Sequence, residues 1–245
     1  MKFQYLSDVH LEMGNRIPLT RSAEHLILAG DIGNPFSSTY SDFINNVSLM
    51  YKHVFIIAGN HEFYDTKQKR SMPETHEQIA SVIKVNQSSK ANVHYLNNTA
   101  YHFPNSDISV FGTTLWTHIP DCHKENIESS INDYNCIPDF SVELNNQLHQ
   151  EAVYALKDHI CAYPDRKWIV VCHHLPQTRL VLPMYQGLSI NAAFATDVPI
   201  FDDDRIVAVV YGHTHTPSVQ GKYYCNSFGY PKENINHNLG ANFEI

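Results

Sequence analysis

Short apolar runs alternate along this chain with longer stretches in which apolar residues recur at helical spacing. Each run holds four to six residues, and several are continuously apolar, as expected of strands that are covered on both faces. The predicted strands are Phe3–Leu6, Leu26–Ala29, Val54–Ala58, Val93–Leu96, Ile108–Phe111, Trp168–Cys172 and Ile206–Tyr211.

The spacing of apolar residues predicts three helices, over Ser37–Lys52, Glu74–Val85 and Ser141–Ala162. Strands that alternate with helices indicate a layered α/β domain. No internal repeat, low-complexity tract or linker divides the sequence, so we expect one domain over residues 1–245. Residues 117–139 and 176–204 have weaker periodicity and are expected to form loops or a small cap over the site.

Composition and charge narrow the choice of partners. The net charge is −8 and no basic block offsets it, which argues against an extended nucleic-acid surface. An anionic substrate would therefore have to be attracted by bound metal cations. The apolar runs are too short to cross a bilayer, and Met1–Ser7 reads as a strand rather than a secretory signal. Five cysteines without a Cys-x-x-Cys pair suit free thiols in a reducing compartment, so we expect a cytoplasmic protein.

Polar side chains of the kinds that bind metals follow five of the apolar runs directly. In chain order these segments are Leu6-Ser7-Asp8-Val9-His10, Ala29-Gly30-Asp31, Ala58-Gly59-Asn60-His61-Glu62, Val171-Cys172-His173-His174 and Tyr211-Gly212-His213-Thr214-His215. Ligands of open α/β sheets bind beyond the carboxyl ends of the strands, so these segments are expected to converge on one crevice.

The residue types in these segments suit the hydrolysis of a phosphate ester by two metal ions. Two ions about 3.5–4 Å apart activate water at neutral pH and neutralise charge on the attacking and leaving oxygens. Carboxylate, imidazole and amide oxygen ligands hold such ions, and glycines at 30, 59 and 212 leave room beside them. The predicted metal ligands are Asp8, His10, Asp31, Asn60, His173, His213 and His215.

Each of these residues also has a simpler interpretation. Asp8 and Asp31 could be turn or helix-capping residues, and Asn60 could occupy a left-handed turn. Only the combination of all five segments, each at the end of a predicted strand, favours a metal centre.

In that order the segments resemble the calcineurin-like metallophosphoesterase family. The resemblance covers positions 8 to 215 and implies a four-layer α/β/β/α sandwich with mixed sheets. It also implies two divalent metal ions, of which Mn, Fe, Zn and Ni all suit the ligands. One ion would be held by Asp8, His10, Asp31 and His215, and the other by Asp31, Asn60, His173 and His213, with Asp31 bridging.

The same resemblance implies roles for residues that do not bind metal. His61 would act at the leaving-group oxygen. Of the adjacent pair, His173 rather than His174 is expected to be the ligand, because it comes first after the strand. Tyr64 and His174 are the candidates for contact with substrate. Glu62 is expected to orient a neighbouring histidine.

The predicted activity is hydrolysis of a phosphate mono- or diester by a metal-bridging hydroxide. The segments Ile32-Gly33-Asn34 and Ile57-Ala58 lack the arginines that protein phosphatases of this superfamily carry there, so a small phosphorylated molecule or nucleotide is the expected substrate. A non-catalytic interaction scaffold on the same fold and a nuclease for short nucleic acids are the alternatives. Scaffolds typically lose ligands or the histidine of the Gly-Asn-His segment, and this chain keeps them all.

Overall fold

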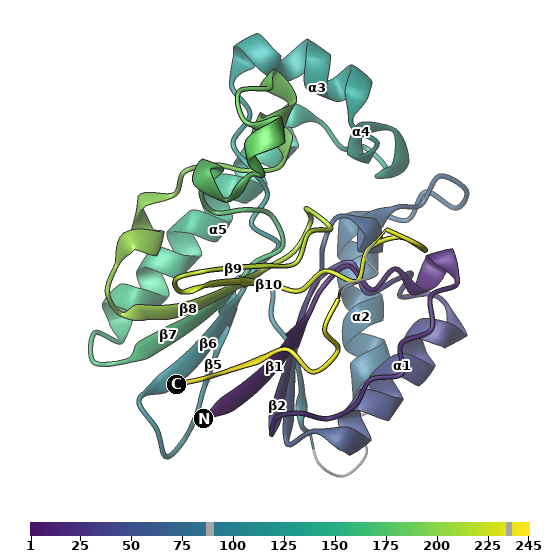
Figure 1. The fold of residues 1–245 in the computed structure, drawn as a ribbon. Coiled ribbons are helices and arrows are strands. Elements are labelled where there is room, and N and C mark those ends of the chain that lie inside the picture. The colour runs from purple at the N-terminus through teal and green to yellow at the C-terminus, as the bar shows by residue number, and fades with distance from the viewer. Residues whose placement is uncertain (87–90, 234–236) are drawn as a thin grey trace.

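Two mixed β-sheets lie face to face between two layers of helices in the computed structural model (Figure 1), which describes residues 1–86, 91–233 and 237–245. The first sheet has the order β11-β1-β2-β3-β4, in which β11 is antiparallel to β1 and the other pairs are parallel. Its strands are β1 (Lys2–Leu6), β2 (His25–Ala29), β3 (His53–Ile57), β4 (Val93–Tyr95) and β11 (Asn242–Glu244).

The second sheet has the order β5-β6-β7-β8-β10-β9, with a parallel centre and an antiparallel strand at each edge. Its strands are β5 (Thr99–His102), β6 (Ile108–Gly112), β7 (Lys167–Val171), β8 (Ile206–Tyr211), β9 (Ser218–Gln220) and β10 (Tyr223–Cys225).

The continuous apolar runs are explained by burial on both faces of each sheet. In β2, Leu26 and Leu28 pack toward the helices, whereas Ile27 and Ala29 pack toward the other sheet. Successive side chains of a strand point to opposite faces, so a strand buried on both sides has no polar face to reveal its period.

Helices cover the outer face of each sheet. α1 (Ser38–Met50) and α2 (Met72–Asn86) flank the first sheet, and α5 (Val142–Ala162) flanks the second (Figure 1). Ser37 and Ser141 cap α1 and α5 by accepting hydrogen bonds from backbone amides three residues on. The predicted four-layer α/β/β/α sandwich is therefore confirmed.

Among the described residues, the strands that the apolar pattern does not predict are short and lie at or next to the sheet edges. β5, β9, β10 and β11 have three or four residues each and lack an apolar run of four or more residues, so hydrophobic periodicity does not reveal them. They form because neighbouring strands offer unpaired backbone groups, which is a tertiary effect.

Residues 117–139 and 176–204, which we call the cap segments, contain short helices and pack against each other. α3 (Lys124–Ser130) and α4 (Asp133–Cys136) belong to the first segment, and Ile119 and Ile127 bury themselves there with Ala193 of the second. The 3₁₀ helices of the part of the chain that the structure describes are η1 (Leu11–Met13), η2 (His61–Phe63), η4 (Asp121–His123), η5 (Thr178–Leu180), η6 (Pro183–Tyr185), η7 (Ser189–Ala193) and η8 (Pro199–Asp202). Among the described helices, none combines the length and the apolar character needed to cross a membrane.

Candidate metal centre

The five predicted segments converge where the carboxyl ends of β1, β2 and β3 meet those of β7 and β8. Backbone hydrogen bonds join neighbouring loops, from Asp8 N to Gly30 O (3.0 Å) and from Gly212 N to His173 O (3.0 Å). A bond from His213 N to Asp8 Oδ1 (2.9 Å) ties the two sheets together at this edge. The parallel order within each sheet therefore brings sequence-distant polar side chains to one place.

The backbone is strained at most of the predicted ligands. Asp8, His10, Asp31, His213 and His215 all have positive φ, between 48° and 70°. Non-glycine residues rarely adopt this left-handed conformation, and clusters of it are found at functional sites. Five of the seven predicted ligands share it, so the strain coincides with the candidate centre.

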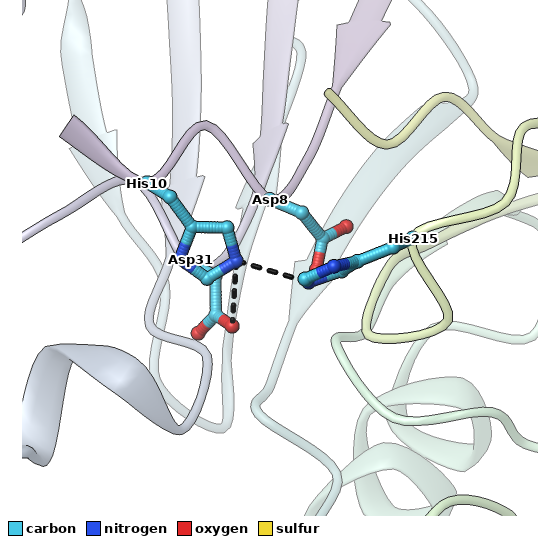
Figure 2. A group of neighbouring side chains, drawn as sticks. All are labelled: Asp8, His10, Asp31 and His215. Atoms are coloured by element: carbon cyan, nitrogen blue, oxygen red, sulfur yellow. Dashed lines mark hydrogen bonds and ion pairs between the residues drawn. The ribbon is translucent and has the colours of Figure 1, made fainter. Parts of the chain in front are cut away.

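Asp8, His10, Asp31 and His215 form the first group of ligand atoms (Figure 2), each within 4.8 Å of the others. The Nε2 atoms of His10 and His215 are 3.0 Å apart, and Asp31 Oδ2 lies 3.7 Å from His10 Nε2. Asp8 Oδ1 lies 3.6 Å from His215 Nε2. Three of the four residues are buried, and His215 is partly exposed.

Asp31, His173 and His213 form the second group, again with ligand atoms within 4.8 Å of one another. His173 Nε2 lies 3.3 Å from Asp31 Oδ2 and 3.1 Å from Asn60 Oδ1. Asp31 thus belongs to both groups, and its Oδ2 atom faces a histidine of each.

The hydrogen bonds on the far sides of the imidazoles show that these atoms fit a cation. The Nδ1–H groups of His10, His215 and His173 donate to Glu12 (2.8 Å), Glu233 (2.7 Å) and the carbonyl of Ala29 (2.9 Å). With Nδ1–H used in this way, the Nε2 atom of each ring faces other acceptors, and acceptors at such distances need a proton or a metal ion between them.

The pKa values of His173 and Asp31 are shifted in the directions that favour their charged forms. Burial lowers the pKa of His173, but the charges of Asp31 and Asp8 outweigh it and raise the pKa to about 10. Burial raises the pKa of Asp31, but His173 and His61 hold it well below its usual range, so this carboxylate stays ionised.

Two glycines are required by close packing around Asp31. A Cβ at Gly59 would collide with Asp31 Oδ1, and a Cβ at Gly30 would lie 2.6 Å from Gly59 N and from His173 Nδ1. Gly30 also has a φ of 84°, which L side chains rarely adopt.

Glu62 does not orient a histidine, so that expectation is wrong. Its buried carboxylate instead accepts hydrogen bonds from four backbone amides, which belong to Asp31 (3.0 Å), Ile32 (2.6 Å), Gly33 (3.3 Å) and Gly59 (2.7 Å). Glu62 thereby clamps the loop after β2 to the loop after β3. Its nearness to Asp31 in space, rather than its place in the sequence, decides this role.

His61 lies beside the two groups with its ring at the cavity. Its backbone N–H donates to Asp31 Oδ1 (2.9 Å), its Nδ1 lies 3.3 Å from Glu12 Oε1, and its Nε2 lies 3.1 Å from the hydroxyl of Tyr230. Burial lowers the pKa of His61, but the carboxylates of Asp31, Glu12 and Glu62 outweigh it and raise the pKa to about 9. Glu12 also contacts His10, so His10, Glu12 and His61 form a third cluster.

Asn60 is held by a buried carboxylate from the first cap segment. Its Nδ2 donates to Asp133 Oδ1 (2.8 Å), which leaves Oδ1 turned toward His173. The hydroxyl of Tyr64 donates to the same Asp133 oxygen (2.6 Å), and its ring stacks on His61 with centroids 4.2 Å apart.

The two candidates for substrate contact occupy different environments. Tyr64 lines a cavity of about 610 Å³ that opens beside the two groups. His174 is only 1% exposed, packs behind His213 and donates from Nδ1 to Thr114 O (3.2 Å), so it does not line that cavity. His61, His213 and His215 do line it.

Several residues that contact the candidate ligands or His61 were not among the predicted site residues. They are Glu12, Asp133, Ser227, Tyr230 and Glu233. Glu12 continues the alternation of Asp8 and His10, which is a weak signal. The others come from the cap or from the chain after β10, where no local pattern points to the centre.

Comparisons with known proteins bear on the family and the fold of the chain. The family model described as calcineurin-like phosphoesterase matches residues 1–217. The chain is similar to a protein of Acanthamoeba polyphaga mimivirus named "Uncharacterized protein L509", with 29% identity over 279 residues, 99% of this chain and 96% of that protein. The solved structure of phosphopantetheinyl hydrolase (PptH) from Mycobacterium tuberculosis superposes with a TM-score of 0.70 and 15% identity over 94% of this chain and 90% of that one. At that identity the likeness shows a shared fold.

Proposed function

Because this chain belongs to the calcineurin-like phosphoesterase family, whose members are metal-dependent hydrolases, we propose that it cleaves a phosphate mono- or diester of a small molecule or nucleotide at two metal ions. The proposed ligands are Asp8, His10, Asp31 and His215 for one ion and Asp31, Asn60, His173 and His213 for the other.

The position of Asp31 is the observation that carries the proposal. One oxygen of this ionised carboxylate lies 3.7 Å from His10 Nε2 and 3.3 Å from His173 Nε2, between the two groups. Holding two like-charged ions close together requires a shared anion, and Asp31 is placed to be one.

The residues around the two groups support different roles for the bound ions and for His61. Bound ions would supply a hydroxide nucleophile at neutral pH and neutralise charge on the phosphate oxygens. His61 lies close to the two proposed ligand sets but belongs to neither, and its ring faces the cavity. We assign it to hold a proton for the leaving-group oxygen, with Glu12 fixing the ring through Nδ1.

The donors do not select one metal. Imidazole, carboxylate and amide oxygen without a thiolate suit Mn, Fe, Zn or Ni, so the choice depends on availability. The name of the phosphopantetheinyl hydrolase does not select a substrate either, because the likeness to it concerns the fold alone.

A screen of the metal-reconstituted protein tests the activity. The substrates are p-nitrophenyl phosphate, bis-p-nitrophenyl phosphate, 2′,3′- and 3′,5′-cyclic nucleotides and a short oligonucleotide, with Asp31→Asn as the control for contaminating hydrolases. Turnover that depends on added metal and disappears in Asp31→Asn supports the proposal and separates monoesters from diesters. Binding of two ions without turnover of any ester indicates a scaffold, and cleavage of the oligonucleotide alone indicates a nuclease.

A further inference from the structure

The cavity beside the metal centre has two chemically different walls. One wall holds the polar side chains of the centre, among them His61, His213 and His215. The other wall comes from the second cap segment and is mostly apolar, with Asn191 as a polar exception. Its apolar and aromatic side chains are Val181, Leu182, Tyr185, Leu188, Ile190 and Phe194.

The apolar wall begins at the metal centre itself. The ring of Phe194 lies 4.8 Å from the ring of His213, one of the proposed ligands, at an angle of 34°. On the polar side the ring of Tyr64 stacks on His61. A phosphoryl group at the centre would therefore have aromatic and aliphatic surface directly beside its ester oxygen.

Part of this wall is exposed to solvent and does not belong to the hydrophobic core of the cap segments. Tyr185 is 48% exposed and Leu188 is 51% exposed, whereas that core is built from Ile119, Ile127 and Ala193. Removing exposed apolar surface from water is favourable by about 25 cal/mol of free energy per Å². A ligand that covers Tyr185 and Leu188 therefore binds more tightly.

Beyond the metal ligands and His61, the charges of the cavity are negative. Among the described residues that line it there is neither a lysine nor an arginine, and Asp133 and Glu233 are acidic. A second phosphate or a carboxylate on the organic part of the substrate would find no cationic partner other than His61, which lies at the metal centre. A cavity of about 610 Å³ also holds a group much larger than phosphate, within the range of small-molecule sites.

We propose that the wall from Val181 to Phe194 is a subsite for the organic part of the substrate, and that this part is an uncharged apolar or aromatic group without a second phosphate. This inference rests on the proposed function, because the phosphate must sit at the metal centre for its ester group to reach the wall. Tyr185 and Leu188 are the residues that determine this specificity.

Matched pairs of esters test the inference. Methyl phosphate and 2-naphthylmethyl phosphate both release an alkoxide but differ in apolar area, and hexyl phosphate and 1,6-hexanediol bisphosphate differ by one phosphate. We expect kcat/KM to be about 10-fold or more higher for the naphthylmethyl ester than for the methyl ester. Hexyl phosphate should exceed the bisphosphate several-fold. Leu188→Ser should reduce the first ratio about 3- to 10-fold.

Leu49→Ser is the matched control, because Leu49 is 60% exposed at the end of α1, away from the cavity. A second readout is the affinity of the metal-loaded protein for methylphosphonate and for 2-naphthylmethylphosphonate, which are not hydrolysed. Hydrolysis of all esters with equal kcat/KM, or an unchanged ratio in Leu188→Ser, overturns the inference and leaves the proposed function intact. Absence of hydrolysis together with tighter binding of the naphthyl phosphonate, lost in Leu188→Ser, overturns the proposed function and supports the subsite.

Discussion

The Nε2 atoms of His10 and His215 lie 3.0 Å apart although 205 positions separate the two residues in the sequence. Each ring is fixed from behind, His10 by Glu12 and His215 by Glu233, so both Nε2 atoms turn toward the same point. Asp31 and Asp8 present oxygens to it as well. Four acceptors around one point are stable only with a proton or a cation among them, which connects the geometry to metal binding.

We therefore predict that the protein binds about two equivalents of Mn²⁺. Asp31→Asn should weaken both sites because its carboxylate belongs to both groups, whereas Asn60→Ala should weaken chiefly one. Elemental analysis after saturation and desalting measures the stoichiometry. Two retained equivalents and full turnover in Asp31→Asn would contradict the bridging role.

Glu62→Gln should destabilise the fold. The carboxylate accepts from four buried backbone amides, and an amide side chain would direct its own N–H groups at some of them. We expect a loss of about 2–4 kcal/mol in the free energy of unfolding, measured by urea denaturation of the metal-free protein. Glu74→Gln is the matched control, since Glu74 accepts from Ser71 at the exposed start of α2 and should cost less than about 1 kcal/mol. Equal losses of unfolding free energy in the two variants would mean that the hydrogen bonds of Glu62 to the two loops do not stabilise the fold.

Asp133→Leu should lower the affinity for one of the two ions. Asp133 holds the Asn60 amide so that its oxygen faces His173, and the leucine cannot accept that hydrogen bond. Loss of such an outer partner typically reduces metal affinity about 10- to 100-fold. Isothermal titration with Mn²⁺ should show one weakened site and one unchanged site. Tyr64→Phe removes the hydroxyl that donates to Asp133 and accepts a 3.3 Å hydrogen bond from Asn60 Nδ2, but it leaves the carboxylate that holds the amide, so it should have a smaller effect. A weakening of both sites in Asp133→Leu would indicate general disruption instead of positioning.

Acid should destabilise the protein through a histidine cluster far from the metal centre. Burial, and then the neighbouring His53, lower the pKa of His25 and of His94 to about 4. The neutral rings are thus favoured in the folded protein, while the unfolded chain takes up protons near pH 6.5. Stability should therefore fall as the pH drops from about 6.5 toward 4. Urea midpoints at several pH values measure this, and His94→Phe should make the dependence less steep. An identical dependence in that variant would exclude the cluster as the cause.

The sequence reveals the fold and the candidate ligands for the same physical reason. Strands buried on both faces must be apolar throughout, so the polar residues at 8, 31 and 60 stand out where each strand ends. The partners of these residues are hidden because they depend on tertiary packing. Asp133 reaches Asn60 across 73 positions, from a cap segment whose short helices lack a long apolar period. Glu233 reaches His215 from a loop without any pattern.

His61→Ala should lower kcat while the metal content stays unchanged. His61 faces the cavity between Glu12 and Tyr230 and belongs to neither proposed ligand set. A general acid contributes roughly 10²–10⁴-fold, so a loss in that range is expected for esters with alkoxide leaving groups. The loss should shrink for p-nitrophenyl phosphate, because p-nitrophenolate leaves without a proton. Elemental analysis of the variant must accompany the kinetics, since a lost metal equivalent would make His61 a ligand. If good and poor leaving groups suffer equally while both ions remain, the imidazole stabilises charge near the phosphate without transferring a proton. If kcat hardly changes, His61 only packs beside Tyr64.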